Sequence, residues 1–364
     1  MSDGDLKKAR SRIDELDQQI QKLIAERATV ALDIRKIKAE GGQTNDHYRP
    51  AREAEVLRRA IARNKDLKSP LSDEVMARLM REVMSACLAL ESPLAVSYLG
   101  PEGTYTQAAV YKHFGHQVSA RVAAAIDEIF RDVESGSATY GVVPIENSTE
   151  GVVSSTLDLL ANTPLSICGE VWLPVHHHLL SNHKRRQDIR KIYAHAQSFA
   201  QCRRWLDAKL PQAERIAVAS NGLAAQMVRK AGKGAAIAGA AAAELYKLGT
   251  LASNIEDDPN NTTRFLVIGR QNPEPTGRDM TSLVMSAHKD RAGALFQLLE
   301  PFAQSTISLT KIESRPSRRA AWDYNFFIDL EGHQADPKVK PALELVQSRA
   351  AYFRILGSYP RAVV

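Results

Sequence analysis

The stretch that most constrains the fold lies at the start of the chain, where nothing interrupts a long helix. Neither proline nor glycine occurs between Leu6 and Glu40. Apolar residues recur there at the heptad spacing of a helix that packs along its length. The two heptad rows contain Ile13, Ile20 and Ile34, and Leu16, Leu23, Val30 and Ile37. The pattern predicts one long helix from Asp5 to about Glu40, and with it a helical N-terminal domain.

Charged residues interrupt the apolar faces of this domain. Arg27 takes the place of an isoleucine in the first heptad row, and Lys38 lies about 20° away from it around the helix. Glu53 and Glu91 lie on the apolar faces of two further helices. These helices are predicted over 51–64 and 72–90. One such residue would be a surface charge on an apolar stem, but four favour a polar pocket in the core of a bundle, where an anion could bind between the cations.

Length and charge limit the class of protein. At 364 residues the chain is too long for one ordinary domain, and its 44% apolar and 25% charged residues are typical of a globular protein. The net charge is +6, but the basic residues are interleaved with acids, so no nucleic-acid partner is predicted and small acidic substrates account for the excess. Proline-containing boundaries predict domains at 1–92, 93–272 and 273–364.

The cysteines and the apolar segments indicate a cytoplasmic protein. The three cysteines are widely spaced and odd in number, which predicts neither a disulfide framework nor a zinc site. The first residues lack the apolar core of a signal peptide, and no apolar run is long enough to span a membrane. We therefore expect no membrane partner.

Strand and helix patterns alternate through the middle of the chain. The strand Tyr140–Ile145 is followed at once by Glu146, Asn147, Ser148 and Thr149, and then by a helix predicted over 152–160. Side-chain donors and free N–H groups at a strand–helix junction form an anion site, with a plain polar turn as the alternative. Other strands are predicted over 94–99, 165–173, 192–194, 215–217, 235–238 and 265–269.

Two motifs invite readings that their spacing does not support. The turn Gly100–Thr104 lacks the glycine spacing of a dinucleotide site and the lysine of a P-loop, so nucleotide binding is not expected. His176, His177 and His178 are consecutive, and neighbouring residues on a strand point to opposite faces. They therefore cannot converge on one ion, and no metal site is predicted.

The C-terminal residues follow the order strand, helix, strand, strand, helix, strand, which is the ferredoxin-like pattern. These elements are predicted over 281–287, 292–302, 307–315, 324–330, 337–349 and 352–359. The fold class predicted for the whole chain is therefore multidomain: an all-α domain, a two-lobed α/β domain and an α+β domain.

Residues 6–91 resemble the all-helical chorismate mutase domain. The resemblance is carried by Arg10 before Asp17, Ala25–Arg27, Lys38, the pair Arg52–Glu53, and Ser85–Glu91 with Cys87. It implies a homodimer of paired first helices, with Arg10 reaching the partner's pocket. In that pocket Arg27 and Arg10 bind the carboxylates of chorismate, Lys38 a carboxylate and the ether oxygen, and Glu53 the ring hydroxyl. The rearrangement to prephenate requires no nucleophile, metal or cofactor.

Glu91 departs from the family pattern, because some members carry glutamine there. An ionised carboxylate would repel the negative charge that develops on the ether oxygen. Glu91 is therefore expected to act in its protonated form, which burial beside apolar side chains favours. Mutase turnover should then fall as the pH rises, and Glu91→Gln should flatten the profile.

Residues 96–269 resemble the catalytic domain of prephenate dehydratase, which removes carbon dioxide and the 4-hydroxyl group to give phenylpyruvate. The matching motifs are Gly100–Thr104, Glu146–Ser148, His195–Ser198, Ser220–Asn221 and Asn261–Phe265. The resemblance implies two lobes joined by crossing strands, with the substrate between them, and a role for Thr263 beside the leaving hydroxyl. Asn147 and Gln197 would orient the substrate, and Thr104, Ser148 and Ser220 would bind carboxylates. Arg264 is either a substrate ligand or part of a structural ion pair, and Phe265 packs to position Thr263.

Residues 273–364 resemble the ACT domain of the same enzymes. The motifs are Gly293–Ala294–Leu295 and Glu313–Ser314–Arg315–Pro316, which match phenylalanine-binding positions. The resemblance implies feedback inhibition by L-phenylalanine at sites on a dimer interface. Gly293 allows close approach to a helix N-terminus, which suits a carboxylate. Ser308 stands where many relatives have asparagine, which leaves the affinity for the effector open.

Two other classes of function remain as alternatives. A transcriptional regulator can combine a helical N-terminus with a two-lobed fold, but a long first helix carrying a buried arginine does not form a helix-turn-helix. A sensor of aromatic precursors without catalysis would share the fold, and Thr263 argues against it. The residues do not distinguish prephenate from arogenate as the substrate.

Overall fold

The computed structural model describes residues 3–40, 48–288, 292–317 and 324–363. It divides into two compact units. The helical unit is Met1–Arg49, Val56–Leu94 and Phe114–Ser119, and the main unit is Pro50–Glu55, Ala95–His113 and Ala120–Val364.

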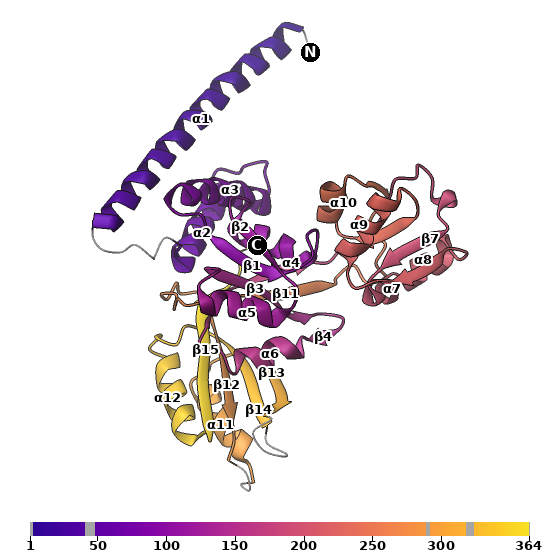
Figure 1. The fold of residues 1–364 in the computed structure, drawn as a ribbon. Helices are drawn as coiled ribbons and strands as arrows, with labels where there is room; N and C mark the ends of the chain where they lie inside the picture. The colour runs from indigo at the N-terminus through magenta and orange to yellow at the C-terminus, as the bar shows by residue number, and fades with distance from the viewer. Residues whose placement is uncertain (1–2, 41–47, 289–291, 318–323, 364) are drawn as a thin grey trace. The chain divides into compact units, whose positions relative to one another are not determined.

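Three helices form the N-terminal region, as predicted (Figure 1). They are α1 (Asp3–Glu40), α2 (Pro50–Asp66) and α3 (Asp73–Glu91). Pro50 begins α2 at a position where its missing N–H costs nothing. Ser72 caps α3, because its hydroxyl accepts the backbone N–H of Val75.

Helix α1 packs against α3 but leaves its heptad rows uncovered. The Arg35 guanidinium donates to the carbonyl oxygen of Leu90 at 3.1 Å, which ties the two helices together. Leu23 is 63% exposed and Ile37 is 67% exposed, and Ile13, Leu16, Ile20, Val30 and Ile34 are also exposed. Both heptad rows of α1 are therefore largely exposed in the single chain.

The main unit contains two α/β lobes joined by paired strands, which confirms the predicted two-lobed fold. The first lobe has the sheet order β2-β1-β3-β11-β5, with β4 beside β3, and the second has β10-β6-β9-β7-β8. Strand β5 (Ser166–Pro174) leaves the first lobe, and β11 (Thr262–Gly269) returns to it antiparallel to β5.

The remaining elements of the lobes alternate along the chain. The strands are β1 (Ala95–Leu99), β2 (Ser119–Ala123), β3 (Tyr140–Asn147), β4 (Gly151–Val152), β6 (His178–Ser181), β7 (Lys191–Ala194), β8 (Glu214–Ala217), β9 (Ala235–Ala238) and β10 (Gly249–Ala252). The helices are α4 (Tyr105–Phe114), α5 (Ile126–Ser135), α6 (Ser154–Leu160), η1 (Arg186–Asp188), α7 (Ala196–Gln201), α8 (Arg203–Lys209), α9 (Asn221–Ala231) and α10 (Ala240–Tyr246).

The chain after β3 differs from the prediction of a helix over 152–160. Gly151, at φ 82°, turns the chain back, and Gly151–Val152 pair with the end of β3 before α6 begins at Ser154. The side chain of Asn147 stabilises this turn by accepting the N–H groups of Thr149 and Glu150. A side-chain turn of this kind competes with helix formation, and it explains the later start of α6.

The third sheet has the order β13-β14-β12-β15 and confirms the predicted ferredoxin-like pattern. Its elements are β12 (Asp279–Ser286), α11 (Ala294–Gln304), β13 (Leu309–Pro316), β14 (Tyr324–Glu331), α12 (Val339–Arg349) and β15 (Tyr352–Pro360). One face of the sheet packs on α11 and α12 through Leu283, Phe302 and Val346. The other face shares a hydrophobic core with the first lobe, in which Val284 and Tyr359 belong to the same cluster as residues of β3 and β11.

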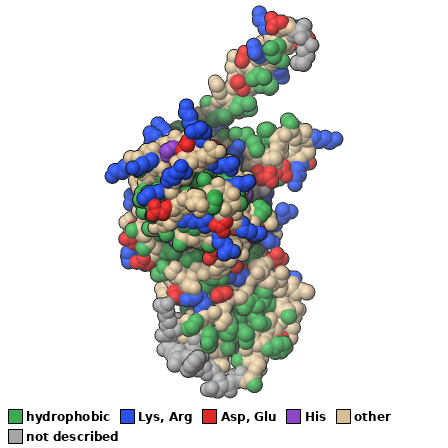
Figure 2. All heavy atoms as spheres, turned by 90° about the vertical axis from the view of Figure 1, so that its right-hand side faces the viewer, with side chains coloured by type: hydrophobic (Ala, Val, Ile, Leu, Met, Phe, Trp, Pro, Cys, Tyr) green, Lys and Arg blue, Asp and Glu red, His purple; other side chains and the backbone are tan. Residues whose placement is uncertain are grey.

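Two observations concern the predictions that the chain has no nucleic-acid partner and no membrane partner. On the face shown in Figure 2, basic and acidic side chains are interspersed rather than gathered into a basic patch. No helix in the described ranges has both the length and the apolar character needed to cross a membrane.

Candidate active sites

The predicted dehydratase motifs meet at one edge of the two lobes. Gly100–Thr104 follows β1, and Glu146–Ser148 forms and follows the end of β3, which is parallel to β1. His195–Ser198 and Ser220–Asn221 follow the parallel strands β7 and β8. Asn261–Phe265 opens β11, which is antiparallel to β3, so its beginning lies beside the end of β3. The carboxyl ends of parallel strands are where α/β folds bind ligands.

Asn147 and Thr263 are the central pair of this edge. They are cross-strand partners on β3 and β11, and Asn147 Nδ2 donates to Thr263 Oγ1 at 2.8 Å. The amide orientation is fixed, because Asn147 Oδ1 accepts the backbone N–H groups of Thr149 at 3.0 Å and Glu150 at 3.1 Å. Thr263 Oγ1 is therefore an acceptor toward Asn147, and its own hydrogen is free to point elsewhere.

A line of hydrogen bonds joins this pair to the second lobe. Asn147 Nδ2 also donates to Asn261 Oδ1 at 2.8 Å, and Asn261 Nδ2 donates to Gln201 Oε1 at 3.1 Å. His177 Nε2 lies 2.8 Å from the same Gln201 oxygen and therefore carries a hydrogen. Its Nδ1 lies 3.0 Å from the Tyr105 hydroxyl, which donates to the carbonyl oxygen of His176 at 2.7 Å.

Burial disfavours the charged forms of the groups at the end of this line. Desolvation lowers the pKa of His177 below its ordinary value, against the opposing effects of the Gln201 hydrogen bond and of Glu256. Desolvation likewise raises the pKa of Tyr105. Burial thus disfavours the charged form of His177, and the contact with Gln201 places a hydrogen on its Nε2.

Gln201, His177 and Tyr105 were not among the predicted site residues. Gln201 lies one helical turn after Gln197, on the same face of α7, and this spacing is the one sequence signal that could have indicated it. Gln201 Nε2 is buried and has no hydrogen-bond partner within the part of the chain that the structure describes. A buried donor of this kind suits a ligand.

The three consecutive histidines have separate partners. His176 Nδ1 lies 2.8 Å from Glu256 Oε1, and His178 Nδ1 accepts the backbone N–H of Asn254 at 3.2 Å. His177 belongs to the line toward Gln201. Among the described residues, no group of three or more His, Cys, Asp or Glu side chains could hold a metal ion.

The other predicted substrate ligands are arranged around helix starts. Ser220 caps α9 by accepting the N–H of Leu223 at 3.1 Å, and Thr104 Oγ1 accepts the N–H of Gln107 at 3.4 Å at the start of α4. A Cβ atom added to Gly222 would lie 2.7 Å from the carbonyl oxygen of Glu102, so the two helix starts approach closely. Helix N-termini carry positive partial charge and bind anions.

Ser148 and Gln197 have different hydrogen-bond partners within the protein. Ser148 Oγ accepts the N–H of Thr262 at 3.0 Å, which holds β3 against β11, and its hydrogen can still be donated to a ligand. Gln197 lies in the first turn of α7, where its N–H donates to His195 Nδ1 at 3.4 Å. Asn221 accepts the N–H of His195 at 2.9 Å and donates to Ser198 Oγ at 2.7 Å, which brings the starts of α7 and α9 together.

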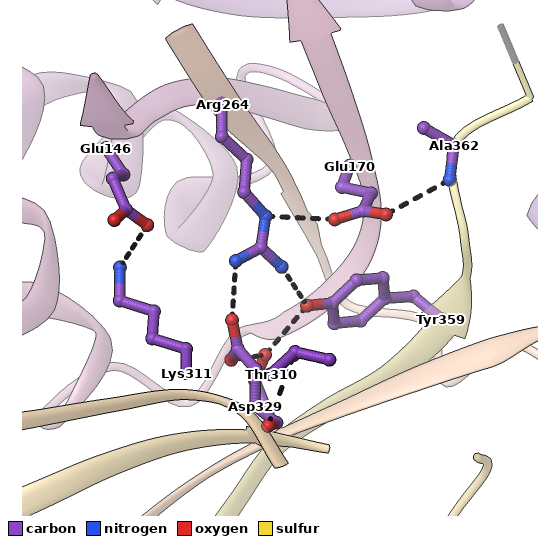
Figure 3. A network of polar contacts seen from close by, with 9 residues as sticks. Glu146, Glu170, Arg264, Thr310, Lys311, Asp329, Tyr359 and Ala362 are labelled. Atoms are coloured by element: carbon purple, nitrogen blue, oxygen red, sulfur yellow. Dashed lines mark hydrogen bonds and ion pairs between the residues drawn. The ribbon is translucent and has the colours of Figure 1, made fainter. Parts of the chain in front are cut away.

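Arg264 lies on the opposite face of β11 from Thr263, because neighbouring strand residues alternate. Its side chain is 5% exposed, and the guanidinium contacts Glu170 at 2.9 Å, Asp329 at 2.5 Å and the Tyr359 hydroxyl at 3.0 Å (Figure 3). Burial opposes its charge, but these three partners raise the pKa above its ordinary value. Of the two roles considered for Arg264, these contacts are those of a structural ion pair. Phe265 is also buried, as packing requires.

Two of the predicted mutase residues meet in the helical unit. Lys38 Nζ lies 3.6 Å from Glu91 Oε2, and the two side chains are 17% and 11% exposed. Arg27 is partly buried on the same helix as Lys38, and its Nη1 donates to the carbonyl oxygen of Val83 on α3 at 3.4 Å. Cys87 is buried one turn before Glu91.

The remaining predicted mutase residues lie on α1 and α2. Arg10 is exposed on α1. Arg52 and Glu53 lie in the first turn of α2, where Arg52 Nη1 contacts Glu55 Oε2 at 2.7 Å.

The two predicted effector motifs lie on α11 and β13. Gly293 adopts the left-handed conformation, at φ 76°, directly before Ala294 and Leu295 open α11. Glu313–Pro316 form the end of β13, an edge strand. Arg315 Nε contacts Asp158 Oδ1 of α6 at 3.1 Å, so this strand is joined to the first lobe.

Comparison with known proteins matches all three regions. Family models match residues 9–92 as chorismate mutase type II, 96–273 as prephenate dehydratase and 281–344 as an ACT domain. The chain is 52% identical to the bifunctional chorismate mutase/prephenate dehydratase of Stutzerimonas stutzeri, and 51% identical to that of Pseudomonas aeruginosa, with 100% of each chain covered in both cases. A solved prephenate dehydratase from Arthrobacter aurescens, in complex with L-Phe, is 34% identical with a TM-score of 0.69, covering 74% of this chain and 93% of that one.

The order of the domains defines a multidomain enzyme with two catalytic domains followed by an ACT domain. The chain belongs to the family of bifunctional chorismate mutase/prephenate dehydratases. It is thus an isomerase and a lyase in one polypeptide.

Proposed function

We propose that this chain converts chorismate to prephenate in its helical domain and prephenate to phenylpyruvate between its two lobes, under feedback inhibition by L-phenylalanine. The observation that carries the dehydratase proposal is the Asn147–Thr263 hydrogen bond. Because Asn147 donates to Thr263, the threonine hydroxyl keeps its hydrogen for the substrate.

In the dehydration, Thr263 O–H donates to the 4-hydroxyl group of prephenate as that group leaves. The bond between the ring and its carboxylate breaks and releases carbon dioxide, the electron pair of that bond passes through the ring, and the C–O bond at position 4 breaks as the ring becomes aromatic. The leaving hydroxide takes a proton from the solvent and departs as water. A hydrogen bond that strengthens as negative charge develops on the oxygen lowers the barrier.

The two carboxylates and the ring would be held by the surrounding donors. The starts of α4 and α9 offer N–H groups to the carboxylates, and Ser220 offers a hydroxyl, whereas the Thr104 hydroxyl already donates to the carbonyl oxygen of Leu99 at 3.2 Å. Gln197, and the buried Nε2 of Gln201, supply amide donors from α7. We place Ser148 mainly in the support of β11, because its oxygen already accepts a backbone N–H.

In the mutase pocket, Lys38 and Glu91 would lie at the ether oxygen, because they already meet at 3.6 Å. Arg27 and Arg10 would bind the carboxylates, Glu53 the ring hydroxyl, and Arg52 and Cys87 would line the pocket. Arg10 would come from a partner chain in a homodimer, which the exposed apolar rows of α1 support. That Glu91 acts in its protonated form stays a prediction.

The ACT domain would bind L-phenylalanine at Gly293–Leu295 and Glu313–Pro316. The Arthrobacter relative, which is in complex with L-Phe, supports L-phenylalanine as the ligand. Three buried free cysteines support a reducing compartment, and we place the protein in the cytoplasm.

The test supplies the purified full chain with chorismate alone and follows phenylpyruvate, with and without L-phenylalanine. Formation of phenylpyruvate that slows with the amino acid would support all three assignments. Accumulation of prephenate would refute the dehydratase assignment, and untouched chorismate with consumption of added prephenate would refute the mutase assignment. Arogenate offered beside prephenate distinguishes the two substrates.

A further inference from the structure

Two ion pairs connect the ACT sheet to the strands that carry the dehydratase pair. Arg264 of β11 contacts Asp329 of β14 at 2.5 Å, and Glu146 of β3 contacts Lys311 of β13 at 2.6 Å (Figure 3). Both contacts are direct, and three of the four side chains are at most 13% exposed, with Glu146 at 37%.

The four residues form two cross-strand pairs, one on each sheet, and each such pair is called a rung. Arg264 and Glu146 are cross-strand partners on β11 and β3, and Lys311 and Asp329 are cross-strand partners on β13 and β14. The Lys311–Asp329 pair of the ACT sheet therefore contacts both members of the Arg264–Glu146 pair of the dehydratase sheet.

The next rung on the dehydratase sheet is the catalytic pair. Thr263 precedes Arg264 and is paired with Asn147, which follows Glu146. Side chains alternate along a strand, so the ion-paired rung faces the ACT sheet and the Thr263–Asn147 rung faces the other side. A displacement of Arg264 and Glu146 must move Thr263 and Asn147, because the residues are consecutive in both strands.

The ACT rung is also close to a predicted effector motif. Lys311 lies two residues before Glu313 on β13, so the two side chains share a face. Arg315 lies on that face as well and contacts Asp158 of α6. Lys311 and Arg315 therefore attach the motif-bearing strand to the first lobe at two points.

The buried pair resists being pulled apart. Arg264 also contacts Glu170 and Tyr359, and Asp329 Oδ1 accepts the Ser282 hydroxyl at 2.6 Å. Separating buried charges leaves each one desolvated and unpaired, which is strongly unfavourable. A shift of β13 and β14 is therefore transmitted to β11 and β3 instead of being absorbed at the contact.

We propose that the Lys311–Asp329 rung couples effector binding on the ACT domain to the Thr263–Asn147 pair by moving Arg264 and Glu146. This inference rests on the proposed inhibition by L-phenylalanine and assigns its route. Arg264 then acts in regulation and in support of the sheet, while Thr263 acts on the substrate.

The test is Lys311→Met in the full-length enzyme, which keeps the aliphatic stem and removes the charge at Glu146. We expect dehydratase turnover without effector within about twofold of the parent, unchanged affinity for L-phenylalanine by calorimetry, and at least tenfold weaker inhibition. Asp329→Asn, which keeps hydrogen-bonding capacity toward Arg264 and Ser282, should weaken inhibition in the same direction. Lys340→Met, at an exposed position on α12, is the matched control and should remain inhibited as the parent is.

Reciprocity gives a second readout that a loss of stability would not produce. If the sites are coupled, prephenate must weaken the binding of L-phenylalanine to the parent by the same factor by which the effector weakens prephenate binding. In Lys311→Met this factor should approach one. Lys311→Met that binds L-phenylalanine and remains fully inhibited would overturn the assigned route. A parent enzyme that neither binds nor responds to L-phenylalanine would instead refute the proposed regulation, and the route with it.

Discussion

The side-chain amide of Asn147 determines in which direction the Thr263 hydroxyl can donate its hydrogen. Two backbone N–H groups orient Asn147, and Asn147 in turn makes Thr263 an acceptor on its protein side. We expect Thr263→Val to lower dehydratase turnover about 100-fold or more, the effect of losing a positioned proton donor. Thr263→Ser, which keeps the hydroxyl, should retain much of the activity. Phenylpyruvate formation from prephenate measures both, and equal losses in the two variants would contradict the role.

The buried imidazole of His177 predicts a pH dependence of stability. Its pKa is lowered by desolvation in the folded chain, whereas in the unfolded chain it is near 6.5. Below that value the unfolded state binds more protons, so this residue makes stability fall with falling pH through and below about 6.5. Urea unfolding between pH 5 and 8 should show a shallower decline in His177→Gln than in the parent. The exposed His288→Gln provides the control, and parallel profiles for the parent and His177→Gln would contradict the assignment.

At the scale of elements, α1 is a helix whose apolar rows have no cover in one chain. We expect Ile20→Asp and Leu23→Asp to weaken dimerisation and mutase activity together, because each buries a charge in the proposed helix pair. Gln18→Glu, a polar change at an exposed position on the same helix, should leave both unchanged. Light scattering and chorismate turnover measure the two effects. A monomeric parent would exclude the paired helices.

The proposed contribution of Arg10 to the pocket of a partner chain can be tested by complementation. Arg10→Ala and Arg27→Ala should each abolish most mutase activity as homodimers. Differently tagged chains, co-expressed and purified as a heterodimer, should recover about half of the parent activity, because one pocket then has both arginines intact. Dehydratase activity of the same sample reports the amount of folded enzyme. No recovery in the heterodimer would show that each pocket is built from one chain.

The approach of β15 to β5 depends on a residue without a side chain. A Cβ atom on Gly357 would lie 2.3 Å from the carbonyl oxygen of Ile167, and backbone cannot move aside as a side chain can. We expect Gly357→Ala to destabilise the main unit by at least about 2 kcal/mol, by overpacking. Gly249→Ala, where the nearest atom is at 3.3 Å, should cost less in the same thermal unfolding assay. An equally stable Gly357→Ala would contradict this packing.

At the scale of the whole molecule, the residues proposed for the two reactions form separate sets, because Lys38 and Glu91 lie in the helical unit and Thr263 lies in the main unit. Thr263→Val should therefore convert chorismate to prephenate at the parent's rate and then stop. Lys38→Ala should show the converse, with prephenate consumed and chorismate untouched. A mutase rate that fell with Thr263→Val would show that the units depend on one another.

The secondary-structure elements and the family could be predicted from sequence because periodicity and short motifs depend on residues that are close together in the chain. Heptad spacing predicted α1, strand and helix periods predicted the main elements of both lobes and of the C-terminal sheet, and short motifs indicated each domain. The strands β2, β4, β6 and β10 were not predicted. Length alone is not the reason, because the predicted strands β7, β8 and β9 are also four residues long.

The contacts of single residues were decided by the tertiary structure. Strand alternation places Thr263 and Arg264 on opposite faces, but the Asp329 that pairs with Arg264 lies 65 residues away along the chain. Nothing near Tyr105, His177 and Gln201 in sequence indicates that they form one line toward Asn147. Periodicity records which face of an element is buried, whereas ion pairs and hydrogen-bond direction depend on what packs against that face. The sequence by itself determined the elements, their order and the chemistry of the motifs, and only the tertiary structure decided which side chains meet.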